Sequence, residues 1–391
     1  DYAVTGVQTC ALPISKGASG VHGLAVDPEG KLWVQFHGAN VWDTVFVPDS
    51  GRFLRTRAIY IYNKNGTPAS FSPMYFFDFG TSRDFYMLGN NGRGLTTDHE
   101  GNILVSVFQR MYKIDYRTGR AIRFVNPGNV TLGAPAVAAN GTIFIAAVIN
   151  PQPIRMYDKD FNSLGNALDS VHGFHRSMGV SPDGNTIWWG GYTLRTGVEY
   201  RRTDEFSPFT VRDTVLRGFS SESFGWNRKY ARLWAAAGSG SDLPNLYPGA
   251  VTSWSVATWY AFNPTNRAIT DSLKWVGLRD SPNQRPRAIA FSPGGDTAYV
   301  GVFGSSTIPS IQVFVNPNPG TNVRYESPNV PSGFELAQNY PNPFNPSTDI
   351  KFTVAKEGAV RITVYDILGN IVRILVDRSE EHTSELQSRH N

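Results

Sequence analysis

Two histidines in the run HGFH, from His172 to His175, are the first residues whose types and spacing could do chemistry. On a helix, side chains three residues apart share one face and could hold one metal ion. Here the flanking residues indicate a loop, and ordinary loop histidines are the alternative. The runs DPEGK and SPDGN resemble calcium loops but lack the ligand spacing of an EF-hand. With no G-x-S-x-G, H-E-x-x-H or P-loop motif present, we predict no catalytic residue, metal ligand or cofactor.

The elements that would position any such residues are short strands. One pattern recurs along the chain: an apolar run, a tight turn that closes on glycine, and a second apolar run, as in GLAVDPEGKLWVQF. Proline sets the backbone angle of the second turn position, and glycine accepts the positive φ that other residues resist. The turn positions are Gly30, Gly101, Gly141, Gly184, Lys229 in a degenerate copy, and Gly295.

The spacing of these turns predicts the fold class. The intervals are 71, 40, 43, 45 and 66 residues, and the middle three fit one four-stranded propeller blade. The long intervals require insertions, for which GANVWDTVFVPDSGRFLRT and GSGSDLPNLYPGAVTSWSV are candidates. We therefore predict an all-β chain with a β-propeller of about six blades. A propeller of seven blades is the alternative. A β-sandwich is the alternative fold, although its strands would not repeat in such blocks.

Positions eight residues before each turn define a register at the start of each innermost strand. They are His22, Arg93, Gly133, Arg176, Ser221 and Arg287. In a propeller this register lies at one mouth of the central channel, where His22, Arg93, Arg176 and Arg287 would bind an anionic ligand such as an acidic glycan or a phosphate. The alternative is that these arginines brace neighbouring loops. No acid occupies the register, and Glu222 is the nearest one.

The chain ends resemble translated sequencing adapter. Val4–Ile14 back-translates to a DNA sequence whose reverse complement, shifted in frame, encodes the run SEEHTSELQS near the C-terminus. Residues 1–15 and 378–391 are therefore predicted to be adapter-derived artefact, with the gene truncated at both ends. The single cysteine, Cys10, lies in the first of these segments.

The remaining charges do not indicate a nucleic-acid footprint. Excluding two arginines and four acids of the ends from the 36 basic and 32 acidic residues leaves a net charge of +6. The basic residues are scattered, whereas nucleic-acid binding requires them to cluster. No run approaches the roughly 18 apolar residues of a membrane-spanning helix. We therefore expect neither a nucleic-acid partner nor a transmembrane segment.

The repeats at residues 18–316 resemble extracellular propellers of the NHL, streptogramin-lyase-like and YVTN types. Such propellers host many functions, so the resemblance specifies architecture rather than activity. We assign residues 16–316 to the propeller. Residues 317–333 are rich in Pro, Asn, Ser and Gly, which is the composition of a linker.

Residues 334–377 strongly resemble the type A C-terminal sorting domain of the type IX secretion system, here truncated. The run LAQNYPNPFNPST precedes the alternating strands DIKFTV and VRITVYD. Its prolines favour an extended lead-in, and the strands suit a partial Ig-like β-sandwich. The sorting motif comprises Gln338, Asn339, Tyr340, Pro341, Asn342, Pro343, Phe344, Asn345 and Pro346.

These features favour a non-enzymatic propeller on the outer-membrane surface, or in the medium, of a Gram-negative bacterium. The resemblance implies that the type IX secretion machinery handles the parent gene product. The ligand would be an anionic glycan or a surface protein. One alternative is a propeller enzyme, such as a lyase, lactonase or glycan-active hydrolase. Another is a structural surface or adhesion component.

The linker assignment makes a direct prediction. Limited proteolysis should first cut between Asn316 and Gly333, because a linker rich in Pro, Asn, Ser and Gly exposes its backbone to a protease. Mass spectrometry of the early fragments locates the cut. First cleavage within the propeller, with the linker intact, would contradict two independent units.

Overall fold

A computed structural model of the chain describes two separate compact units, which divide between Tyr325 and Glu326. Every secondary-structure element in the described residues is a β strand, and among these residues no helix is long and apolar enough to cross a membrane. The described residues are 20–37, 43–47, 50–85, 92–191, 194, 196–219, 221, 223–237, 254–255, 258–275, 285–303, 311–316, 335–336, 347–353, 358–365, 370–380 and 383–389.

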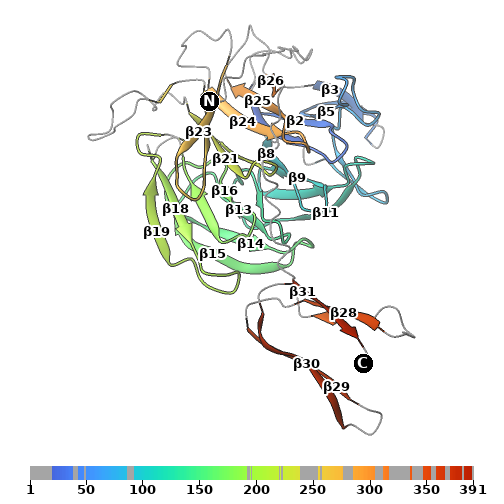
Figure 1. The fold of residues 1–391 in the computed structure, drawn as a ribbon. Helices are drawn as coiled ribbons and strands as arrows, with labels where there is room; N and C mark the ends of the chain where they lie inside the picture. The colour runs from blue at the N-terminus through green and yellow to red at the C-terminus, as the bar shows by residue number, and fades with distance from the viewer. Residues whose placement is uncertain are drawn as a thin grey trace. The chain divides into compact units, whose positions relative to one another are not determined.

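The first unit contains six antiparallel sheets that succeed one another along the chain, which confirms the prediction of a six-bladed propeller (Figure 1). Blades 1 and 6 have three described strands each, and blades 2 to 5 have four. The strands of blades 1 to 3 are β1 (Gly20–Val26), β2 (Leu32–His37), β5 (Ile59–Tyr62); β8 (Gly92–Thr97), β9 (Ile103–Val107), β10 (Arg110–Ile114), β11 (Ala121–Val125); β12 (Ala136–Val137), β13 (Ile143–Ala146), β14 (Gln152–Tyr157), β15 (Ser163–Val171).

Blades 4 to 6 continue the same order, each strand pairing with the next. Outer strands such as β11, β15 and β19 lie at the periphery in Figure 1. The strands of these blades are β16 (Gly179–Val180), β17 (Thr186–Trp189), β18 (Gly197–Arg201), β19 (Val211–Val215); β20 (Phe224–Asn227), β21 (Arg232–Ala237), β22 (Thr258–Phe262), β23 (Ile269–Lys274); β24 (Arg285–Phe291), β25 (Thr297–Phe303), β26 (Ile311–Val315).

The recurrent turn joins the first two strands of each blade. In the first copy, Asp27 Oδ1 accepts hydrogen bonds from the backbone N–H groups of Glu29 (3.0 Å) and Lys31 (2.9 Å). Gly30 then takes a φ of 82°, a left-handed conformation that favours glycine. In the second copy Asp98 Oδ1 likewise accepts hydrogen bonds from the N–H groups of Glu100 (2.9 Å) and Asn102 (2.8 Å), and the recurrence of such turns is why their spacing predicts the blades. The other turn glycines with positive φ are Gly101, Gly141, Gly184 and Gly295.

The longest interval between turns contains the predicted insertion. Between β2 and β5 the chain forms a separate hairpin of β3 (Asp43–Val47) and β4 (Arg52–Thr56). A second small hairpin, β6 (Phe77–Asp78) with β7 (Arg83–Asp84), follows blade 1. Most of the other predicted insertion, residues 238–256, lies outside the described residues.

Six apolar clusters hold the blades together, and each joins two neighbouring blades. The cluster that closes the ring contains Val21 and Leu24 of blade 1 together with Ala288, Ala290 and Ile311 of blade 6. We call this contact the seam. The first and last blades therefore meet through side-chain packing.

The second unit contains two small sheets among its described residues. One comprises β27 (Glu335–Leu336), β28 (Ser347–Thr353) and β31 (Thr383–Arg389), and the other comprises β29 (Gly358–Tyr365) and β30 (Ile371–Glu380). The half-buried Val360 and Ile362 pack on the buried Val376. The Ig-like sandwich stays a prediction, and the sorting motif, residues 338–346, lies outside the described residues, as does the linker.

Part of the predicted adapter segment is paired in the structure. β31 runs antiparallel to β28 from Ser347↔Arg389 to Thr353↔Thr383. The physical reason is that an open strand edge offers unpaired backbone groups, to which an extended segment of any sequence can add. The adapter origin of residues 378–391 stays a prediction, and residues 1–15 lie outside the described residues.

The seam predicts a stability difference between two isoleucines of outer strands. Ile311→Ala should lower the free energy of unfolding by about 2–5 kcal/mol, since it leaves a cavity in the seam. Ile269→Ala is the matched control, because Ile269 is 46% exposed, and it should change stability by less than about 0.5 kcal/mol. Urea unfolding followed by tryptophan fluorescence measures both. Equal losses would show that the seam does not contribute as described.

Candidate functional site

A small pocket lies on the propeller axis. Its lining includes a residue from every blade, namely Leu24, Leu95, Ala134, Arg176, Phe224 and Ile289. Six blades can contribute to one pocket only where their innermost strands converge, so the pocket marks the central channel. Its volume is about 30 Å³, room for roughly two water molecules. The pocket can therefore admit a small chemical group but not a whole sugar ring.

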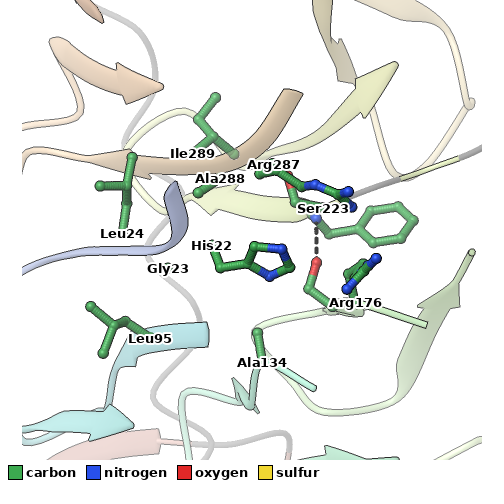
Figure 2. Close-up of a pocket in the computed structure, with 12 residues that line it drawn as sticks. His22, Gly23, Leu24, Leu95, Ala134, Arg176, Ser223, Arg287, Ala288 and Ile289 are labelled. Carbon is green, nitrogen blue, oxygen red and sulfur yellow. Dashed lines mark hydrogen bonds between the residues drawn. The ribbon is translucent and has the colours of Figure 1, made fainter. Parts of the chain in front are cut away.

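Three of the four predicted site residues line this pocket. Figure 2 shows the side chains of His22, Arg176 and Arg287 reaching into the same space from three different blades. Arg93 is not among the lining residues, but it lies close enough to lower the pKa of His22. The shared register thus brings the four residues to one end of the channel.

The backbone aims three of these side chains in the same way. The strand pairing shifts at His22 in β1, at Arg93 in β8 and at Arg287 in β24, so each is the extra residue of a β-bulge. A bulge leaves its residue outside the regular ladder and turns its side chain, and bulges often lie beside functional sites. Three of the six copies therefore share a β-bulge at the register position as well as the sequence spacing.

Close contacts between blades fix the segment around Arg93. Gln35, 1% exposed, accepts a hydrogen bond from the Gly94 N–H at 2.8 Å and donates one from Nε2 to the Ser106 carbonyl at 3.1 Å. A Cβ at Gly94 would lie 2.2 Å from the Cβ of Ala134. Glycine is required there by space as well as by its φ of 159°. The Arg93 backbone is consequently held from both sides.

The third blade contributes no charge at this level, for a steric reason. The Ala134 N–H donates to the Arg176 carbonyl at 2.8 Å, which draws blades 3 and 4 together. A Cβ at Gly133 would lie 2.8 Å from that carbonyl oxygen and 2.9 Å from the ring of His175. A side chain at this register position would therefore push Arg176 out of place.

Two further basic residues at this end were not predicted from the sequence. His37 ends β2, and its ring centroid lies 4.5 Å from that of His22. Arg57, which is 4% exposed, precedes β5 and lowers the pKa of His37. Neither belongs to the innermost strand, so the eight-residue register could not find them. We call the whole set the mouth cluster: His22, His37, Arg57, Arg93, Arg176 and Arg287.

Burial and mutual repulsion shift the pKa values of the mouth cluster. Burial lowers the pKa of His22 well below its ordinary 6.5, and Arg287 is the strongest of the neighbouring cations that lower it further. Burial, followed by Arg93 and Arg176, lowers the pKa of His37 to about 3. The pKa of Arg93 falls to about 10 through burial and the charge of Arg176. Arg93 is therefore charged at neutral pH, whereas the two histidines are neutral.

The HGFH histidines do not share one environment. His172 is exposed, and its backbone carbonyl accepts a hydrogen bond from Trp189 Nε1 at 2.8 Å. His175 is fully buried and stacks on the Trp189 ring at 4.0 Å. Within the described part of the chain, no group of three or more His, Cys, Asp or Glu side chains could hold a metal ion. Glu222 lies outside the described residues.

Comparisons with known proteins do not assign the chain to a family. No family model and no curated protein matches the chain. A luciferin-regenerating enzyme superposes with a TM-score of 0.49 and 12% identity, over 82% of this chain and 96% of that one. A chain of the mitotic checkpoint complex gives a TM-score of 0.45 and 10% identity, over 75% and 86%. Neither likeness indicates what this chain binds or does.

The lowered histidine pKa values predict how stability depends on pH. Below pH 6.5 the unfolded chain protonates His37 while the folded chain does not, down to a pH of about 3. Since the unfolded state then binds more protons, stability falls as the pH drops through this window. His37→Gln should therefore make the melting temperature fall less steeply between pH 6.5 and 3. The change in slope corresponds to the uptake of at most one proton on unfolding. Superimposable pH profiles for the two proteins would contradict the buried, neutral state of His37.

Proposed function

We propose that this protein is an exported, non-enzymatic β-propeller that binds the anionic group of a ligand at the axial pocket. The observation that carries the proposal is a pocket shared by all six blades in which His22, Arg176 and Arg287 converge. A concave site with one sign of charge concentrates ligands of the opposite sign. Arginine also binds carboxylates and phosphates through two parallel hydrogen bonds.

The size of the pocket limits how the ligand binds. About 30 Å³ admits an anionic head group, while the remainder of an acidic glycan or of a surface protein would stay outside. Binding would then depend on a few charged contacts rather than on a large buried area. We therefore expect weak affinity that declines as salt screens the charges.

The export part of the proposal rests on the sequence. Residues 334–377 resemble a type A sorting domain, which implies that the type IX secretion machinery recognises the parent gene product. Under this proposal the propeller acts on the outer-membrane surface, or in the medium, of a Gram-negative bacterium. A cell-surface location agrees with a ligand such as an acidic glycan.

The binding proposal predicts the effect of removing two arginines. Arg93→Ala combined with Arg176→Ala should weaken binding of acidic glycans about a hundredfold or more, since each charged contact contributes roughly 1.5–3 kcal/mol. Arrays of acidic and neutral glycans, probed at low and high salt, measure the change. Melting curves check that the propeller stays folded.

A matched control removes the same charge elsewhere. Arg117→Ala combined with Arg212→Ala deletes two exposed arginines outside the mouth cluster and should leave the array profile unchanged. If the wild type and both double variants gave the same salt-independent profile, the arginines of the mouth cluster would only brace loops.

A further inference from the structure

Beneath the mouth cluster, the pocket has an apolar floor with one polar position. The residues that lie two positions after the six register positions are Leu24, Leu95, Pro135, Met178, Ser223 and Ile289. All six are buried, and Leu24, Leu95, Ser223 and Ile289 line the pocket. We call this part of the pocket the recess, and at this level blade 5 alone supplies a hydroxyl.

Among the residues that the structure describes, the hydroxyl of Ser223 has no hydrogen-bond partner. Ser223 is 4% exposed, and its Oγ atom is buried and unpaired. The two neighbouring serines are already engaged. Ser221 Oγ donates to the Ser223 carbonyl at 3.3 Å, and Ser177 Oγ accepts from the Phe224 N–H at 2.7 Å, the contact drawn as a dashed line in Figure 2. A buried hydroxyl without a partner costs free energy, so its retention points to a bound group.

The polar groups around this recess come from four different blades. Arg176 of blade 4 and Arg287 of blade 6 belong to the blades on either side of Ser223, and His22 of blade 1 also lines the pocket. The guanidinium groups donate, the serine hydroxyl can donate, and the neutral imidazole has one N–H to donate. A planar carboxylate offers two oxygens in one plane. A tetrahedral oxyanion offers oxygens in several directions and suits donors that surround it.

We infer that the axial pocket binds a tetrahedral oxyanion, the phosphate or sulfate group of a larger ligand, and that Ser223 is a specificity-determining residue that donates a hydrogen bond to it. This inference rests on the proposed function and narrows it. Phosphate and sulfate share the geometry that the donors fit. The apolar floor formed by Leu24, Leu95 and Ile289 stops the group at this depth.

The test measures the binding of inorganic phosphate, sulfate and acetate to the whole chain by isothermal titration calorimetry. Ser223→Ala should weaken the binding of phosphate or sulfate about tenfold or more, the loss expected for one hydrogen bond to a charged group, and leave acetate binding unchanged. Ser221→Ala is the matched control, because Ser221 is 2% exposed and its hydroxyl bonds only within the protein. It should bind all three anions as the wild type does.

Melting curves show whether each variant is folded. Should Ser223→Ala unfold at a lower temperature than the wild type, Ser223→Cys takes its place with the same expected loss, because cysteine keeps the shape of serine and donates only weakly.

Tighter binding of phosphate than of sulfate would identify a phosphate ligand, and tighter binding of sulfate would identify a sulfate ester. Both outcomes support the inference.

Failure of the inference differs from failure of the proposed function. Unchanged phosphate and sulfate binding by Ser223→Ala, or an equal loss for acetate, would overturn the role of Ser223. Acetate binding without phosphate or sulfate binding would overturn the tetrahedral ligand and leave an anion site in place. Loss of binding in the double arginine variant would then still support the proposed function. Absence of any anion binding by the wild type would overturn both.

Discussion

Packing between neighbouring blades is the interaction on which the rest of this structure depends. A small twisted sheet has two faces, and a single blade cannot bury them both by itself. Each blade here shares one apolar cluster with the blade before it and another with the blade after it, and the seam supplies the sixth. Because the clusters form a closed circle, no blade is left with an uncovered apolar face.

The same circle explains why the site is where it is. Residues as distant in sequence as His22 and Arg287 meet because each starts an innermost strand, and the ring brings all six starts together. The mouth cluster then places like charges close to one another, which the lowered pKa values of His22 and Arg93 express. Local conflict of this kind, held in place by a stable frame, is typical of sites that have a function.

The parts of the structure that repeat could be predicted from the sequence. The turn glycines have a physical requirement that glycine alone meets without strain, so their spacing revealed the blades, and counting back from them located His22, Arg93, Arg176 and Arg287. His37 and Arg57 were beyond reach, since they belong to second and third strands and have no counterpart in the other copies. Ser223 was hidden for another reason. A serine in a degenerate repeat looks ordinary until the burial of its hydroxyl and the absence of a partner are known. The pairing of β31 with β28 was also unpredictable, because backbone edges carry no side-chain signal.

The seam differs from the other five joints in one respect. Consecutive blades are tethered by the chain that runs from one to the next, whereas Val21 and Ile311 in the seam are nearly 300 residues apart. Strands within a blade are much closer in sequence, whereas the seam forms only when the whole arc of blades bends round, and the entropy of closing that long loop opposes it. The seam is therefore the joint at which the ring of blades closes. An arc that opens there would keep its blades intact while separating Arg287 from His22, so the joint that spans the longest stretch of chain also brings these two residues of the recess together.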